Sequence, residues 1–208
     1  DIVLVLTGCF ILAFGWFGFN PGSTLGASGN GNLRIASVAV NTMLAGMAGS
    51  FGVMFYMWLR YGKPDASMTG NGLLAGLVAV TAPCGFVNPV CSVIIGLIAG
   101  VLVCLSVEFV ERKLKVDDPV GAVSVHGVNG LWGVIATGLF ADGTSNYGGS
   151  WNGVSGSVRG LFYGDPGQLV AQIIGVSALI GVVFTLTFVV NWLIDAVIGQ
   201  RVSAKAEL

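Results

Sequence analysis

Long stretches without a single Lys, Arg, Asp or Glu limit, more than any other feature, how this chain can fold. The stretch from Pro119 to Ala141 is 23 residues long, and the one from Ala66 to Val107 is 42 residues long. An α-helix of about 20 apolar residues crosses the hydrocarbon core of a bilayer. The shorter stretch therefore predicts one membrane-spanning helix, and the longer one must be divided between two.

The composition supports the same class of protein. Hydrophobic residues make up 54% of the chain and charged residues only 9%, whereas a soluble domain carries about a quarter charged residues. A net charge of −1 gives no basic surface for nucleic acid. We therefore expect an all-α integral membrane protein that lies in a lipid bilayer and binds no nucleic acid.

The uncharged stretches predict six transmembrane helices. A turn around Pro83-Cys84-Gly85 and Asn88-Pro89 should separate the third from the fourth, and the third is short. Residues 1–198 should form one transmembrane helical bundle and 199–208 the start of a tail. The expected helices are Ile2–Phe19, Ile35–Leu59, Thr69–Ala82, Pro89–Val107, Val120–Phe140 and Gln168–Ile194.

The positive charges predict which side of the membrane each end occupies. An even number of helices places both termini on one side, and that side collects seven of the nine Lys and Arg residues. Because cytoplasmic loops carry the excess of positive charge, we expect the C-terminus in the cytoplasm of a multi-pass inner (plasma) membrane protein. The seven are Arg60, Lys63, Arg112, Lys113, Lys115, Arg201 and Lys205.

The cysteines and the one long hydrophilic loop leave alternatives open. Cys84 and Cys91 flank the short outer turn and could form a disulfide or remain thiols. No metal-type spacing is present, and we expect no cofactor.

The loop Asp142–Gly164 is either a flexible outer loop with Tyr147, Trp151 and other aromatic residues at the membrane interface, or a ligand loop.

His126, the only histidine, lies inside the fifth predicted helix. An ionisable ring within a membrane span is costly and marks a pathway or a site, the alternative being a packing role. At helical spacing it shares a face with Ala122, Gly130 and Gly133, whose small side chains would leave open volume beside the imidazole. Glycine pairs such as Gly72/Gly76 instead predict close helix packing.

The first helix carries a stripe that runs from aliphatic to polar. Leu12, Trp16, Phe19 and Ser23 follow helical spacing, and Pro21 permits a kink or helix end near Ser23. A hydroxyl with nearby aromatic faces suits a small hydrogen-bonding cation. Helix packing is the alternative interpretation of the stripe.

Three motifs resemble the ammonium transporter (Amt/Mep/Rh) family, in its bacterial Amt branch. Gly15-Trp16-Phe17-Gly18-Phe19-Asn20-Pro21-Gly22-Ser23 is similar to a motif of the family's sixth helix. Thr81-Ala82-Pro83-Cys84-Gly85 is similar to the turn after the eighth helix. Asp117-Asp118-Pro119, followed by Val125-His126-Gly127-Val128-Asn129-Gly130, resembles the start of the tenth.

The resemblance implies a fold, an assembly and residue roles. The chain would be the second half, helices six to eleven, of an eleven-helix bundle that assembles as a homotrimer. Trp16 and Phe19 would line the pore and form its outer gate, and Ser23 would belong to the outer ammonium-recruitment site. His126 would be one of two pore histidines, with Leu12 and Ala122 at apolar lining positions. Position 121 is glycine where some members have an acidic residue.

The implied function is transport of ammonium or ammonia. Ammonium would be recruited at the outer mouth, deprotonated, and passed as ammonia along a histidine-lined lumen. No nucleophile–base arrangement suggests an enzyme. The alternative is an ammonium sensor that signals to a cytoplasmic partner, and the family also implies a PII-type regulator on the basic loops. Since Asp1 is not a methionine, we expect the natural chain to start earlier and to supply the second histidine.

Overall fold

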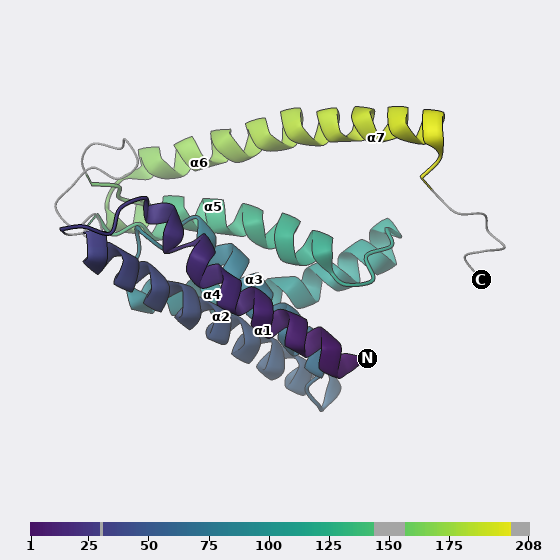
Figure 1. Cartoon of the computed structure of the whole chain (residues 1–208), viewed down its shortest axis with the longest axis horizontal. Coiled ribbons are helices and arrows are strands. Elements are labelled where there is room, and N and C mark those ends of the chain that lie inside the picture. The colour runs from purple at the N-terminus through teal and green to yellow at the C-terminus, as the bar shows by residue number, and fades with distance from the viewer. Residues whose placement is uncertain (30, 144–156, 201–208) are drawn as a thin grey trace.

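The computed structural model describes residues 1–29, 31–143 and 157–200, and nearly all of them are helical (Figure 1). Two short 3-10 turns are η1 (Gly22–Thr24) and η4 (Leu161–Tyr163). Three π-helical segments are η2 (Val110–Leu114), η3 (Val123–Val128) and η5 (Ile180–Phe184). The α-helices are α1 (Ile2–Phe19), α2 (Gly31–Tyr61), α3 (Ala66–Thr81), α4 (Pro89–Phe109), α5 (Asn129–Phe140), α6 (Pro166–Leu179) and α7 (Thr185–Ile198).

Six helical passes correspond to the six predicted ones. Five are long and apolar enough to cross a membrane, and α3, with 16 residues, is the short third pass that the sequence predicts. The η3 segment continues directly into α5, and α6, η5 and α7 form one continuous helix, Pro166–Ile198. The chain is a multi-pass membrane protein.

Capping side chains explain why several helices begin where they do. The Asp65 carboxylate accepts a hydrogen bond from the Met68 N–H at the start of α3, at 2.8 Å. The Asn88 side chain accepts one from the Cys91 N–H at 3.0 Å, and Pro89 occupies the first turn of α4. Such caps satisfy backbone donors that a helix start leaves unpaired. The predicted turn between the third and fourth passes is confirmed.

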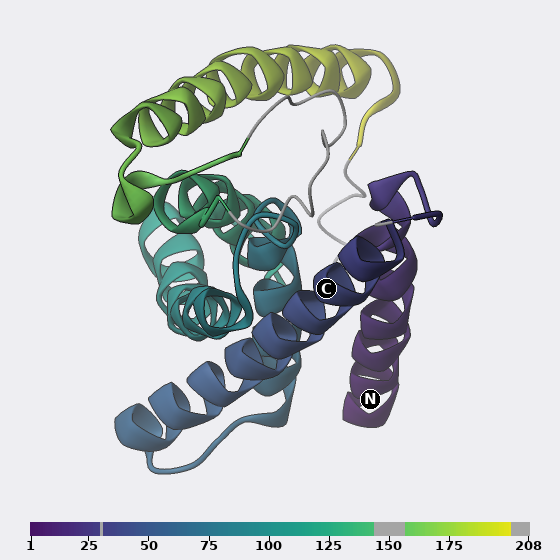
Figure 2. The same cartoon turned by 90° about the vertical axis from the view of Figure 1, so that its left-hand side faces the viewer.

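The helix ends agree with an even number of passes. α1 begins and α7 ends at the same end of the bundle, on the right in Figure 1, together with the turn between α2 and α3. Seen from the other end, α1 lies on the right and the continuous α6–η5–α7 helix runs across the top (Figure 2).

Backbone-to-backbone contacts hold α2 between α3 and α4. A Cβ atom placed on Gly76 of α3 or on Gly96 of α4 would overlap the Ala45 carbonyl oxygen of α2. One turn further along, a Cβ atom on Gly72 or on Gly100 would overlap the Gly49 carbonyl oxygen. The predicted close packing through small residues is confirmed for these helices.

The outer helices are much less covered. In the most apolar 18-residue stretch of the first pass only 6% is buried, and in the corresponding stretch of the α6–η5–α7 helix none is buried. Within the described residues, α7 has no substantial contact except with the η5 segment that leads into it. Tyr147 and Trp151 of the outer loop and residues 201–208 of the predicted tail lie outside the described residues.

Candidate functional site

The indole of Trp16 is held by a hydroxyl group on a neighbouring helix. Its Nε1–H donates a hydrogen bond to Thr81 Oγ1 at 3.0 Å, and the Thr81 hydroxyl in turn donates to the Leu77 carbonyl at 2.8 Å. A tryptophan N–H in an apolar span needs such an acceptor. The half-buried Trp16 ring therefore has a fixed orientation against α3.

The rest of the predicted stripe continues outward from Trp16. The Phe19 ring lies 5.7 Å from the Trp16 ring, centroid to centroid, and is 59% exposed. α1 ends at Phe19, as Pro21 predicts, and Ser23 lies in the η1 turn. The Ser23 hydroxyl donates to the Phe19 carbonyl at 2.5 Å, so its lone pairs remain available to an N–H donor. Leu12, one turn before Trp16, is also exposed.

His126 lies in the π-helical segment η3, which is anchored at its start. Asp118 is 5% exposed, and its Oδ2 accepts a hydrogen bond from the Val123 N–H at 3.0 Å. The Asp118 carbonyl accepts a second bond from the Gly121 N–H at 2.9 Å. The imidazole itself is exposed and makes no hydrogen bond within the described part of the chain.

An apolar groove of about 740 Å³ opens beside the imidazole. One wall is the η3–α5 helix and the other is the continuous α6–η5–α7 helix. The small residues Gly127, Gly130 and Gly175 border it, and a Cβ on Gly127 or Gly130 would meet nothing closer than 3.9 Å. The larger lining residues are Leu131, Val134, Val176, Leu179, Ile180, Val183, Phe184 and Thr187.

The predicted small-residue face is partly wrong. Gly133 does not border the groove, because it packs against the Ala79 carbonyl of α3 with no space for a Cβ atom. Ala122 is the first helical residue and lies outside the groove lining. The π turn is the reason for the first error, because its wider ring changes the phase of all later residues relative to His126.

The predicted residues form two groups rather than one. Trp16, Phe19 and Ser23 lie together along α1, whereas His126 lies on η3, and α3 packs between these elements. The described groove at His126 includes no residue of α1. Among the described residues, the α1 stripe and His126 therefore do not line one common cavity.

Sequence reasoning did not single out Thr81 as a partner of Trp16. The signal available was a hydroxyl in an uncharged helix that could satisfy the tryptophan N–H, but several hydroxyl residues meet that condition. Only the packing of α1 on α3 distinguishes Thr81 from the others.

The four cysteines are thiols, and all are buried. Burial raises the pKa of the Cys84 thiol, in the turn after α3, to about 12. Of the two alternatives for Cys84 and Cys91, the structure has the unpaired one. A neutral, buried thiol behaves as a small apolar group.

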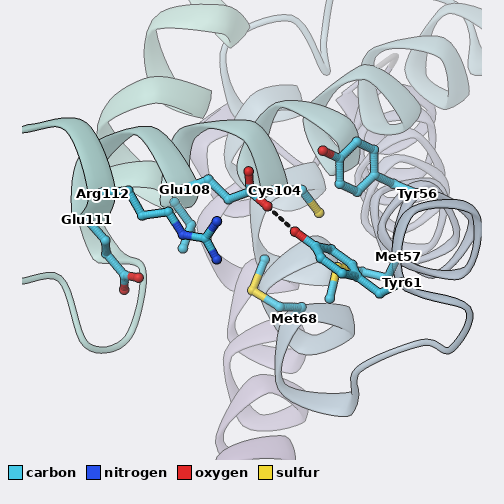
Figure 3. Close-up of a pocket in the computed structure, with 9 residues that line it drawn as sticks. Tyr56, Met57, Tyr61, Met68, Cys104, Glu108, Glu111 and Arg112 are labelled. Atoms are coloured by element: carbon cyan, nitrogen blue, oxygen red, sulfur yellow. Dashed lines mark hydrogen bonds between the residues drawn. The ribbon is translucent and has the colours of Figure 1, made fainter.

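A second, smaller cavity of about 230 Å³ lies between the ends of α2 and α4 and the start of α3 (Figure 3). The Tyr61 hydroxyl donates a hydrogen bond to Glu108 at this cavity, and Glu111 and Arg112 also border it. None of the six predicted site residues is among its lining residues. It is therefore separate from the groove at His126.

Comparison with known families gives a match over the whole chain. The model of the family described as Ammonium Transporter Family matches residues 1–208. The ammonium transporter Amt2 of Archaeoglobus fulgidus is 45% identical over 208 residues, which are 100% of this chain and 43% of that protein. An ammonium transporter of Aquifex aeolicus is 42% identical over 208 residues, 46% of its length.

Solved structures give the same result. Mep2 of Candida albicans superposes with a TM-score of 0.87 at 30% identity, over 99% of this chain and 44% of that one. A protein described as Sensor Amt Protein superposes with a TM-score of 0.86 at 32% identity, over 100% of this chain and 47% of that one. The chain spans about half the length of the relatives it matches.

Proposed function

Because this chain belongs to the ammonium transporter family, we propose that the complete protein moves ammonium or ammonia across a membrane. The observation that carries the proposal is the position of His126, the only histidine, at an apolar groove within a membrane-spanning helix. Polar groups inside membranes are costly and are found where they serve a pathway. No residue is assigned a role in covalent catalysis.

The residues of α1 would recruit ammonium at the outer mouth. The Ser23 hydroxyl donates inward to the Phe19 carbonyl, which leaves oxygen lone pairs for an ammonium N–H. The faces of the Trp16 and Phe19 rings would add cation–π attraction. These contacts would replace part of the water that the ion loses.

The groove would carry the neutral species. A bare cation in an apolar lumen costs at least several kcal/mol, so loss of a proton would precede passage. A neutral imidazole can accept a hydrogen bond at one nitrogen and donate at the other, which suits His126 to hand ammonia onward. Leu12 and Ala122 do not border this groove, and in the complete protein they would supply apolar lining elsewhere along the path.

Replacing His126 by alanine in the complete protein tests the proposal. Loss of a hydrogen bond worth about 1.4 kcal/mol would slow ammonium flux into proteoliposomes by about tenfold. Val183→Ala, on the opposite wall of the same groove, is the matched control and should keep most of the flux. Unchanged flux and ion selectivity in His126→Ala would assign His126 to packing.

A sensor is the second candidate, favoured by the structural likeness to the Sensor Amt Protein. Both functions would use ammonium binding at the outer mouth, and they differ in whether substrate crosses. Ammonium binding by calorimetry without flux in proteoliposomes would support the sensor and overturn the transporter.

Three further features of the complete protein belong to the proposal. We place it in the inner (plasma) membrane with a cytoplasmic C-terminus, as a homotrimer. The homotrimer is what the family resemblance implies, and native mass spectrometry of the complete protein should give three copies. A cytoplasmic PII-type regulator would dock on the basic end that holds Lys63, Arg112, Lys113 and Lys115, and co-purification with such a regulator would test it.

A further inference from the structure

The π-helical turn that carries His126 is stabilised by a side chain that the proposed pathway does not use. Asn129, the first residue of α5, is fully buried. Its backbone N–H is shared between the His126 and Ser124 carbonyls, and the bond to Ser124, five residues earlier, has the spacing that defines a π turn. Its side-chain Nδ2 donates to the same carbonyl at 2.9 Å.

The second bond to the Ser124 carbonyl favours the π register over the α register. In an α-helix the Asn129 N–H would bond to Val125, and the side chain would lose its acceptor at Ser124. A change of one residue in register moves a side chain by about 100° around a helix axis. The register therefore sets where the imidazole points relative to Gly130 and the rest of α5.

His126 depends on this turn for its orientation. The ring is exposed and makes no hydrogen bond within the described residues, so among these residues no contact of its own directs it. Asp118 fixes the start of the turn through the Val123 N–H, and Asn129 fixes its end. The two buried side chains lie on either side of His126 in sequence.

We propose that Asn129 is a positioning residue, which holds the π register of Val123–Val128 and thereby directs His126 into the groove. The Asn129 amide is buried although its Oδ1 atom has no hydrogen-bond partner among the described residues. A buried polar atom without a partner is unfavourable, so the donor half of the amide is what the position uses. This inference rests on the proposed function of His126.

The test replaces Asn129 by leucine in the complete protein, reconstituted in proteoliposomes. Leucine branches at the same atom, forms helix well and removes the unpartnered Oδ1, so the protein should fold with a similar melting temperature. Ammonium flux should fall at least fivefold, and the ratio of ammonium to potassium flux should change, because the imidazole turns away from the groove.

Asn41→Leu is the matched control. Asn41 is equally buried and donates to the Cys84 and Val87 carbonyls, far from the His126 turn. This variant loses two buried hydrogen bonds of the same kind and should leave the flux ratio unchanged. Parental flux and flux ratio in Asn129→Leu would overturn the inference, as would a loss that only follows the amount of folded protein.

Two further variants separate the possible failures. If Asn129→Leu does not fold, the variant Asn129→Asp is used, because it keeps the shape of the side chain and removes the amide donor. Parental flux and flux ratio in Asn129→Asp would overturn the inference.

His126→Ala distinguishes failure of the inference from failure of the proposed function. Lost flux in His126→Ala together with parental flux in Asn129→Leu contradicts only the positioning role, whereas parental flux in His126→Ala contradicts the function itself.

Discussion

At the scale of single residues, the clearest finding is that one hydroxyl group fixes the aromatic stripe of α1. The Trp16 indole N–H donates a hydrogen bond to the Thr81 hydroxyl, and that hydroxyl donates one to the Leu77 carbonyl within α3. The indole N–H therefore has a partner in a region where water is scarce. The bond from Trp16 to Thr81 is the only side-chain hydrogen bond between α1 and α3 among the described residues.

Replacing Thr81 by valine should destabilise the protein by about 1–3 kcal/mol, because valine fills the same space and leaves the Trp16 N–H without an acceptor. Thermal unfolding of the detergent-solubilised complete protein measures the effect. Thr7→Val is the control, since the Thr7 hydroxyl is exposed and bonds only to the Val3 carbonyl of its own helix. Equal melting temperatures for the two variants would contradict the role of Thr81.

Local spacing predicts which residues of the first pass lie together, but not which neighbours they contact. It is enough to place Trp16 and Phe19 along α1 and Ser23 just beyond its end, because that spacing is a local property. The partner of Trp16 depends on how α1 lies on α3, which local spacing does not determine. The same limit explains why Ser23 could be predicted at a helix end but its bond to the Phe19 carbonyl could not.

At the scale of helices, the close packing of α2 against α3 and α4 depends on glycine. Each of the Ala45 and Gly49 carbonyl oxygens lies between two glycines, one from each neighbouring helix. In lipid, where apolar surface gains little from helix contact, such close approach of backbones is a main source of association.

Gly76→Ala should therefore destabilise the protein by about 1–3 kcal/mol, because the added methyl group overlaps the Ala45 carbonyl oxygen and separates two helices. The measurement is the temperature at which the detergent-solubilised protein aggregates. Gly8→Ala in α1 is the control, since nothing lies within 4 Å of the added atom. A Gly76→Ala protein as stable as the Gly8→Ala protein would show that α2 and α3 can separate at little cost.

The helices themselves were predictable, and their internal irregularities were not. Uncharged stretches and turn residues are properties of the sequence alone, so all six passes were found with modest errors at their ends. A π turn changes the hydrogen-bond register without a distinct residue pattern. For this reason Gly130 of the predicted face borders the groove beside His126, whereas Gly133 does not.

At the scale of the whole molecule, the charges and the helix ends agree on one topology. The turn between α2 and α3 and the η2 segment carry most of the positive charge and lie at the end where α1 begins and α7 ends. Alkaline phosphatase inserted in the Asp142–Gly164 loop should be active in a bacterial host, and the same enzyme fused after Ile198 should be inactive. The reverse pattern would place the C-terminus outside the cell.

The contact of α2 with α3 and α4 also has a mechanical consequence. Backbone atoms that touch directly have no side-chain rotamers between them that could adjust, so these three helices should move as one rigid body. If the complete protein transports as proposed, any step that opens or closes a path would then come from elements attached more loosely to this block. Among the described elements, α1 and the α7 end of the α6–η5–α7 helix, whose only substantial contact is with η5, are the parts that can supply such movement.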